Sequence, residues 1–170
     1  MTNRTVDPLE VIFRDAMAHV CTPVAVITAL DGERPHGTTV SAFMSLSMTP
    51  PMVLIALDDR SDLLELIRAT GRFAVNVLNS EQGDLTVSFA KKGPSKFDGV
   101  EWSRVRALPR IEDCPVWIAC VAEELVSGGD HTIVTGSVEA VETRASSPLT
   151  YHDRTFGTHA ISESRLEESA

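Results

Sequence analysis

Most of the chain alternates between short hydrophobic runs and polar turns, a pattern that predicts β-strands. Val24–Leu30 is apolar on both faces and rich in β-branched residues, which indicates a buried strand. Gly37–Thr49 alternates apolar and hydroxyl side chains, as a strand with one packed face does. Strand character recurs in Met52–Leu57, Phe73–Leu78, Val116–Val126, Thr132–Glu142 and Pro148–Phe156. We therefore expect six or seven strands.

Helical patterns are fewer and shorter. The segment from Pro8 to about Val20 carries apolar residues at spacings of three and four, which predicts an amphipathic helix. A second helix is predicted between a Ser61 cap and Gly71, and a third opens at Asn79 and ends before Gly93. The stretch from Lys91 to about Asp113 reads as a loop.

These elements favour a mainly β fold in which an antiparallel sheet closes into a small barrel, because closure removes exposed sheet edges. The hairpin signal Ser127–Asp130 joins the two longest predicted strands. No repeat, linker or low-complexity tract divides the sequence. We expect residues 1–160 to form one domain and residues 161–170, which are small and charged, to form a flexible tail.

Charge and cysteine content narrow the possible partners. The 170 residues include 15 Lys and Arg against 24 Asp and Glu, a net charge of −9, which disfavours nucleic acid as a partner. Three cysteines without a CxxC pair suit reduced thiols, and the first 20 residues lack a signal-peptide hydrophobic region, so we expect a cytoplasmic protein. Residues 35–57 are uncharged, but prolines and hydroxyls interrupt them, so no membrane span is expected. The histidine and cysteine spacings indicate no metal site.

The uncharged strand is the most informative segment. Its apolar positions are Val40, Ala42, Met44, Leu46 and Met48, and hydroxyls occupy Thr39, Ser41, Ser45, Ser47 and Thr49. An ordinary half-exposed strand also fits this alternation. However, a solvated strand normally carries some Lys or Glu, so a neutral hydroxyl face favours a large ligand with several hydrogen-bonding edges.

The sequence resembles the small flavin reductases that serve two-component flavin-dependent monooxygenases. The matching pieces are Pro23–Thr28, Gly37–Ser47 with Pro50 and Pro51, Phe73–Leu78, Phe89–Ala90, Gly129–Ile133 and Gly136–Val138. Each piece is weak alone, but their order and spacing are specific. The resemblance implies an FMN-binding split barrel of Greek-key type, a homodimer, and electron transfer from NADH or NADPH to FMN or FAD. It also implies a separate monooxygenase that receives the reduced flavin.

The resemblance also assigns positions to the flavin. Residues around Thr39, Val40, Ser41 and Ala42 correspond to those at the polar edge of the flavin ring, and Ser45, Leu46 and Ser47 to those along the ribityl chain and phosphate. Arg60 and Ser61 correspond to the phosphate site, since one brings charge and the other begins a helix. Phe89, Ala90 and Lys91 border the flavin, although Phe89 equally suits the core. A basic patch of Lys91, Lys92 and Lys96 suits either a cofactor phosphate or a solvated loop.

His131 is the candidate catalytic residue. The resemblance places it over the flavin pocket near the nicotinamide, where it binds the carboxamide or supplies a proton. Tyr151 and Arg154 fall where the family has an aromatic-rich strand near the dinucleotide. A histidine at a hairpin tip is otherwise usually just solvated.

The function expected is therefore an NAD(P)H-dependent flavin reductase. The sequence contains neither GxGxxG nor GxxxxGK[ST], so a Rossmann or P-loop nucleotide site is disfavoured. The main alternative is a binding protein on the same barrel that keeps its flavin, as an electron carrier or redox sensor. An enzyme resembling pyridoxamine-phosphate oxidase is a third candidate, but it calls for a more basic phosphate pocket.

Overall fold

The computed structural model describes residues 7–160, and within them it has short helices and twelve strands. The helices are α1 (Pro8–Ala18), α2 (Asp62–Thr70), α3 (Gly83–Ala90) and the 3-10 helix η1 (Pro94–Phe97). The mainly β class is therefore confirmed. The predicted flexible tail, residues 161–170, lies outside the described residues.

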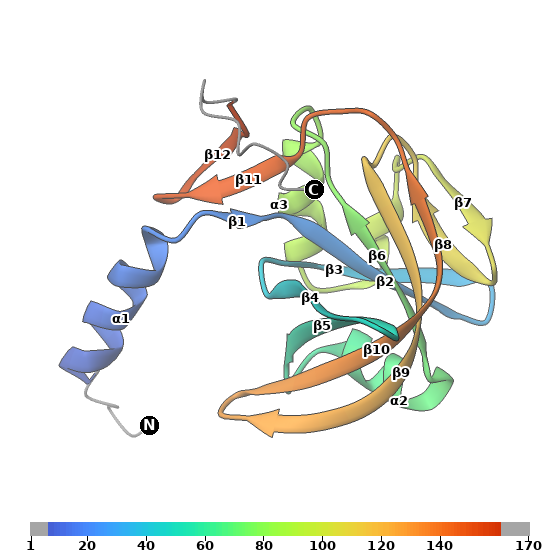
Figure 1. The fold of residues 1–170 in the computed structure, drawn as a ribbon, viewed down its shortest axis with the longest axis horizontal. Helices are drawn as coiled ribbons and strands as arrows, with labels where there is room; N and C mark the ends of the chain where they lie inside the picture. The colour runs from blue at the N-terminus through green and yellow to red at the C-terminus, as the bar shows by residue number, and fades with distance from the viewer. Residues whose placement is uncertain (1–6, 161–170) are drawn as a thin grey trace.

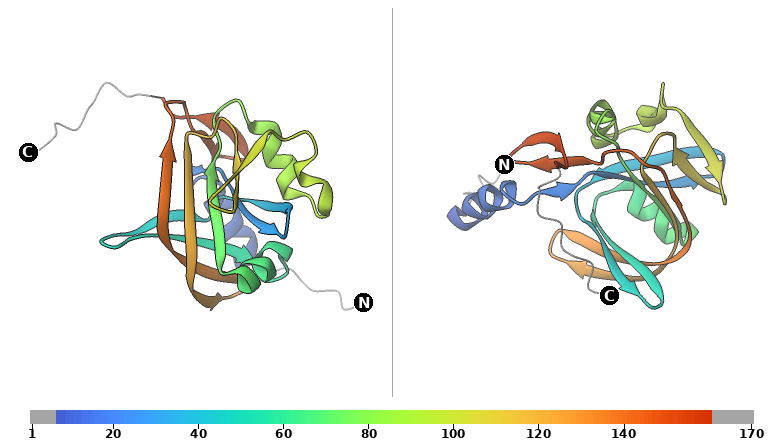
Figure 2. Two further views of the ribbon diagram at one scale, coloured as in Figure 1. Left: turned by 90° about the vertical axis from the view of Figure 1, so that its right-hand side faces the viewer. Right: turned by 45° about the horizontal axis from the view of Figure 1, so that its top comes forward.

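One antiparallel sheet of seven strands forms the body of the molecule (Figure 1). Its strand order is β3 (Arg34–Val40), β2 (Ala25–Asp31), β6 (Arg72–Val77), β9 (Val116–Gly128), β10 (His131–Thr143), β5 (Pro51–Asp58) and β4 (Phe43–Met48). The sheet curls round on itself, as the right-hand view of Figure 2 shows. Its two edge strands, β3 and β4, are consecutive in the chain and are separated only by Ser41 and Ala42.

Two smaller sheets extend the body. One contains β1 (Thr22–Pro23), β11 (Leu149–His152) and β12 (Thr155–Thr158), so Pro148–Phe156 includes parts of two strands and not one. The other is a hairpin of β7 (Trp102–Val105) and β8 (Leu108–Ile111). The prediction of a loop from Lys91 to Asp113 was therefore wrong, because η1 and this hairpin lie within it.

The core has two main parts on opposite faces of the sheet. Inside the curl, Ile27, Phe73 and Val134 pack together with Leu63, Leu64 and Ile67 of α2, all fully buried. On the outer face, α3 and η1 pack against the sheet through Phe89 and Phe97, whose rings meet edge to face at 4.9 Å. Strand β2 contributes alternate residues to both parts, which confirms that it is buried on both faces.

The helix limits follow local chemistry. Asp7 caps α1, since its Oδ1 accepts from the Leu9 amide at 2.9 Å. Gly71 ends α2 with a φ of 67°, a left-handed conformation that glycine adopts without strain. Helix α3 begins at Gly83, later than predicted, because Asn79 and Gln82 form a turn first: the Asn79 amide donates to Gln82 Oε1 at 3.0 Å.

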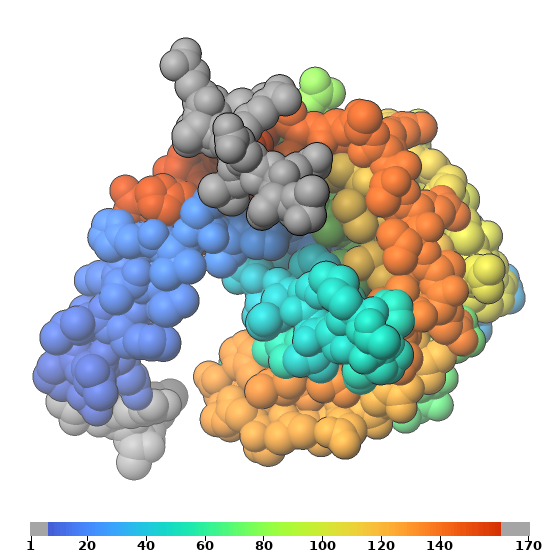
Figure 3. Space-filling model, viewed as in Figure 1, coloured from blue at the N-terminus to red at the C-terminus, as the bar shows by residue number. Residues whose placement is uncertain are grey.

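Two apolar surfaces face solvent. Helix α1 has no buried residue, and Figure 3 shows it standing off the body of the molecule. The predicted strand Gly37–Thr49 breaks at Ser41, where the chain turns from β3 into β4. The expectation that its apolar face packs was wrong beyond Ala42, because β4 is an edge strand: Met44, Leu46 and Met48 are 56%, 44% and 77% exposed. No helix within residues 7–160 is long and apolar enough to cross a membrane.

Candidate functional site

A cavity of about 590 Å³ opens beside β3, where the uncharged strand lies. This volume is typical of small-molecule sites. Its floor is made by residues of β3 and the following turn, and its other walls come from the end of β5, the start of α2, the segment after α3, and the start of β10. The lining includes Thr38, Thr39, Val40, Ser41, Ala42, Ala56, Leu57, Ser61, Ala90 and His131.

The charge of the lining differs from that of the whole chain. Four cationic side chains face the cavity, from Arg60, Lys91, Lys92 and Lys96, against two carboxylates, from Asp58 and Asp62. The chain as a whole carries a net charge of −9. The cavity is thus a local positive region suited to an anionic ligand.

Close packing between α3 and β3 sets one wall. A Cβ built on Gly37 would lie 3.0 Å and 3.1 Å from two ring carbons of Phe89, so the absent side chain lets the ring approach the strand. The Thr39 hydroxyl donates to the Thr86 carbonyl at 2.9 Å and ties the same two elements together. These contacts bring the end of α3, with Ala90 and Lys91, over the strand that forms the floor.

Arg60 is held by Asp58 at the end of β5. The guanidinium donates from Nε and Nη2 to the two carboxylate oxygens at 3.0 Å and 2.7 Å, and the Arg60 amide donates to Asp58 Oδ1 at 2.8 Å. Hydrogen bonds from Arg60 lower the pKa of Asp58 well below its usual range. Asp58 therefore stays ionised and fixes the direction of a cation that is otherwise largely exposed.

Ser61 follows directly and begins α2. Its side chain makes no capping hydrogen bond to the helix, and Ser61 and Asp62, the first residue of α2, both line the cavity. A helix N-terminus with free donors favours a negatively charged group.

His131 lies beside Asp58, where β10 begins and pairs with the end of β5. Its Nδ1 is 2.7 Å from Asp130 Oδ1, and this hydrogen bond lowers the pKa of Asp130. Within residues 7–160, Nε2 of His131 has no hydrogen-bond partner. The imidazole therefore offers that nitrogen at the cavity edge.

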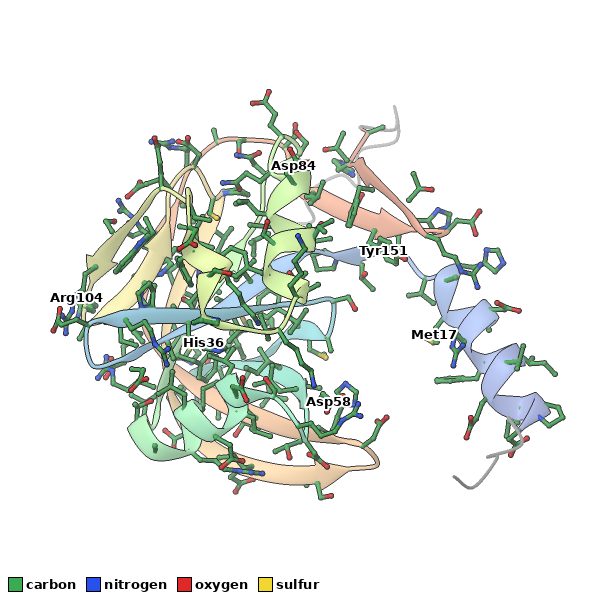
Figure 4. All side chains as sticks on the ribbon, turned by 180° about the vertical axis from the view of Figure 1, so that it is seen from behind. Met17, His36, Asp58, Asp84, Arg104 and Tyr151 are labelled. Carbon is green, nitrogen blue, oxygen red and sulfur yellow. The ribbon has the colours of Figure 1, made fainter. Side chains whose placement is uncertain are left out.

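Two further basic groups lie deeper. Lys96 of η1 donates from Nζ to the Gly37 carbonyl at 2.9 Å, and burial lowers its pKa. The pKa of His36 is also lowered, mainly by burial and then by the Lys96 charge, and its buried Nδ1 lacks a hydrogen-bond partner among the described residues. In Figure 4, His36 and Asp58 are labelled and lie on different strands of the lining.

The cavity gathers most of the residues that the sequence suggested as a site. Those that line it are Thr39, Val40, Ser41, Ala42, Arg60, Ser61, Ala90, Lys91 and His131. Ser45, Leu46 and Ser47 are on β4 beyond the turn and are not in the lining; the Ser47 hydroxyl instead accepts from the Thr49 amide at 3.2 Å. Phe89 is fully buried behind the wall.

Tyr151 on β11 and Arg154, in the turn between β11 and β12, also lie away from the cavity. The ring of Tyr151 is 5.3 Å from that of Phe156, and Arg154 pairs with Asp15 of α1. Within residues 7–160, no cluster of His, Cys, Asp and Glu is arranged to hold a metal ion.

Sequence reasoning missed several lining residues, above all His36, Asp58 and Asp62. The Asp-x-Arg spacing of Asp58 and Arg60 after a strand was an available signal, since such a pair can share a bidentate bond. No local signal marks His36, because it reaches the cavity only through the packing of β3 under η1.

Comparisons with known proteins give related sequences and a related fold. The family described as "Flavin reductase like domain" matches residues 17–160. The actinorhodin polyketide dimerase of Streptomyces coelicolor is 38% identical over 148 residues, which cover 85% of this chain and 84% of that protein. The reductase subunit HsaB of a flavin-dependent monooxygenase from Mycobacterium tuberculosis is 37% identical over 130 residues, 76% of this chain and 70% of that subunit.

A solved structure is similar over nearly the whole chain. It is the NADH:FAD oxidoreductase SgcE6 of Streptomyces globisporus C-1027, in complex with NAD and FAD fragments. The TM-score is 0.86 at 30% sequence identity, and the match covers 95% of this chain and 99% of that one.

Proposed function

This chain belongs to the flavin reductase-like domain family, and on that premise we propose that it is an NAD(P)H-dependent flavin reductase. It reduces FMN or FAD and supplies the reduced flavin to a separate monooxygenase. One observation carries the proposal. The region that matches the family contains a cavity whose lining is positively charged, although the chain as a whole is acidic.

The cavity residues fit a flavin. A flavin ring needs a flat, weakly polar surface, which the small side chains of Val40, Ala42 and Ala56 provide. Its polar edge needs neutral donors and acceptors, which the backbone and the Ser41 hydroxyl offer. Its phosphate needs cations and free amides, and Arg60 and the start of α2 lie at the same wall.

The residues of the chain bind and orient the flavin and the nicotinamide cofactor. When bound, these two cofactors would supply the hydride-transfer chemistry. Arg60, Ser61 and Lys91 hold the flavin phosphate, and Asp58 fixes the direction of Arg60. Thr39 to Ala42 orient the ring. His131 contacts the nicotinamide end through Nε2, where it binds the carboxamide or supplies a proton.

Purified protein tests this function directly. A reductase oxidises NADH or NADPH only when FMN or FAD is added. A protein that is isolated yellow and leaves NADH unchanged is a flavin-holding carrier, which would contradict the proposal. Arg60→Met should raise the KM for flavin, whereas Arg104→Met, which removes an equal charge paired with Glu33 on the outside, should leave it unchanged.

We also propose that the sheet is a closed split barrel of Greek-key type and that two chains form a homodimer. Support for the closure comes from β3 and β4, the two sheet edges, which follow each other in the chain. Support for the dimer comes from the apolar surface of α1 and β4, where Leu9, Phe13 and Met48 are 69%, 64% and 77% exposed. Light scattering of the purified protein tests it: a monomer at micromolar concentration would contradict the dimer.

The same proposal covers the partner protein and the cellular location. HsaB is named as a reductase subunit, which supports a separate oxygenase as the consumer of reduced flavin. The cysteines Cys21, Cys114 and Cys120 are free thiols, which supports a cytoplasmic location.

A further inference from the structure

Two neighbouring segments carry the groups proposed above to hold the two cofactors. Arg60, proposed for the flavin phosphate, follows the end of β5, and His131, proposed for the nicotinamide, begins β10. The two strands pair directly, with His131 opposite Asp58, so both groups lie at neighbouring strand ends. Figure 1 shows the β9–β10 turn at the free end of a long hairpin, and strand ends of this kind fray most readily.

Asp59 holds the two strand ends together at two points. Its amide donates to the Asp130 carbonyl at 3.1 Å, which extends the pairing one residue past the last ladder pair of β5 and β10. Its carboxylate Oδ1 accepts from the Thr132 hydroxyl at 2.7 Å. Asp59 directly precedes Arg60, and Thr132 directly follows His131. The side-chain bond therefore joins the two segments that carry the cofactor-binding groups.

The surroundings of the Thr132 hydroxyl fix the direction of this bond. Thr132 is only 4% exposed and lies on the face of β10 opposite to that of His131. Nη2 of Arg68, from α2, lies 3.4 Å from the same oxygen and can only donate, so the single hydroxyl hydrogen points to Asp59. A short bond to a carboxylate that is partly shielded from water is stronger than an exposed neutral one.

We propose that Thr132 and Asp59 are positioning residues of the reductase, which fix His131 relative to Arg60 and thereby hold the nicotinamide in line with the flavin. The inference rests on the proposed reductase function and deepens it. Neither Thr132 nor Asp59 is among the described residues that line the cavity, so both act through their neighbours. Because hydride transfer depends steeply on the alignment of the two rings, loss of this bond should slow the transfer more than it weakens binding.

Anaerobic single-turnover mixing tests the proposal. The full chain is loaded with FMN or FAD and mixed with saturating NADH, and the loss of flavin absorbance gives the rate of hydride transfer. Thr132→Val keeps the shape of the side chain and removes the hydroxyl. It should slow this step about tenfold, while a flavin titration shows a change in affinity of less than about threefold. Thr132→Ser keeps the hydroxyl and should bring the rate back to within about threefold of that of the unmodified chain.

Thr135→Val, on the same strand, is the matched control. The Thr135 hydroxyl accepts from the Glu124 amide at 3.2 Å, and the residue is not part of the described cavity lining. This variant should keep the rate of hydride transfer. Urea denaturation of each variant is measured in parallel, because a merely structural role of Thr132 would lower the urea midpoint without slowing hydride transfer in the folded protein.

A double-variant cycle tests the bond itself and carries the test even if Thr132→Val does not fold. Asp59 is exposed, so Asp59→Ala should fold, and it should slow hydride transfer as much as Thr132→Val does. Asp59→Asn keeps an oxygen acceptor and should keep most of the rate. Combining Asp59→Ala with Thr132→Val should add little further loss, since each change removes the same bond.

Three outcomes would overturn the positioning role. In the first, Thr132→Val or Asp59→Ala transfers hydride as fast as Thr135→Val. In the second, the losses of the two single variants multiply in the double variant, so that the two residues act separately. In the third, flavin affinity falls as much as the rate, which places the effect on binding. An unmodified chain that does not reduce added flavin with NADH or NADPH would instead refute the reductase function itself.

Discussion

Gly37→Ala tests whether the packing of α3 on β3 builds the cavity wall. The added Cβ would lie 3.0 Å and 3.1 Å from the Phe89 ring and 3.2 Å from the Ile27 carbonyl oxygen. Comfortable carbon–carbon contacts are about 3.5–4.0 Å, so the ring must move by roughly half an ångström. Phe89 is fully buried and packed against Phe97, so it has little room to move.

Overpacking of this kind typically costs about 1–3 kcal/mol. For a chain of this length, each kcal/mol lowers the melting temperature by about 2–4 °C. Because Lys96 bonds the Gly37 carbonyl and Lys91 follows α3, the same displacement should also weaken flavin binding several-fold. Urea denaturation at one fixed protein concentration measures the first effect, and flavin titration measures the second.

Gly83→Ala, at the start of the same helix α3, is a matched control. A Cβ at Gly83 meets no atom within 4 Å, and this first residue of α3 has no positive φ. This variant should therefore be stabilised by about 0.4–1 kcal/mol through the unfolded chain, with unchanged flavin affinity. If Gly37→Ala were as stable as Gly83→Ala and bound flavin normally, the account of this wall would be wrong.

Three further predictions concern the core, the pH dependence and His131. Thr28→Val should destabilise the fold by about 1–3 kcal/mol, because the buried hydroxyl donates to the Pro109 carbonyl and accepts from the Asn76 side chain. Thr22→Val is the control: it removes a hydroxyl without a partner in residues 7–160 and should be nearly neutral in urea denaturation. The folded chain holds the pKa of His36 below its ordinary 6.5, so the contribution of His36 to stability is present above pH 6.5 and is lost as the pH falls below that value. The urea midpoint should therefore fall less on acidification in His36→Gln than in the unmodified chain. An identical pH profile in the two proteins would contradict this assignment. His131→Ala should raise the KM for NAD(P)H more than it weakens flavin binding; lost flavin affinity with an intact nicotinamide KM would show that the residue serves the flavin instead.

The regular parts of the fold follow from the sequence because their patterns are local. Val24–Leu30 reads as a buried strand since both of its faces are apolar, and the structure buries it on both sides of the sheet. Gly71 ends α2 as predicted because a left-handed glycine depends on neighbouring residues alone. Ser61 occupies the predicted N-cap position, but its side chain makes no capping hydrogen bond.

The elements that the sequence did not predict depend on unusual turns or on distant contacts. The β7–β8 hairpin turns at Arg106 and Ala107, with φ of 49° and 60°, and neither residue type signals a turn of that kind. The exposed face of β4 reads as packed because alternation shows which residues share a face but not which element covers that face.

The same distinction explains the site. Thr39 to Ala42 line the cavity because they are one continuous segment. Ser45 and Ser47 continue its pattern, yet the turn at Ser41 moves them onto β4 and away from the lining. Asp58, His36 and Lys96 join the site through pairing and packing of separate elements, which spacing along the chain does not encode.

A crystal structure of the chain with bound flavin tests the central claim most directly. The account predicts the flavin ring along Thr39 to Ala42, with its phosphate at Arg60 and Ser61. A flavin bound instead on the exposed methionine face of β4, with the cavity beside β3 filled only by water, would contradict it.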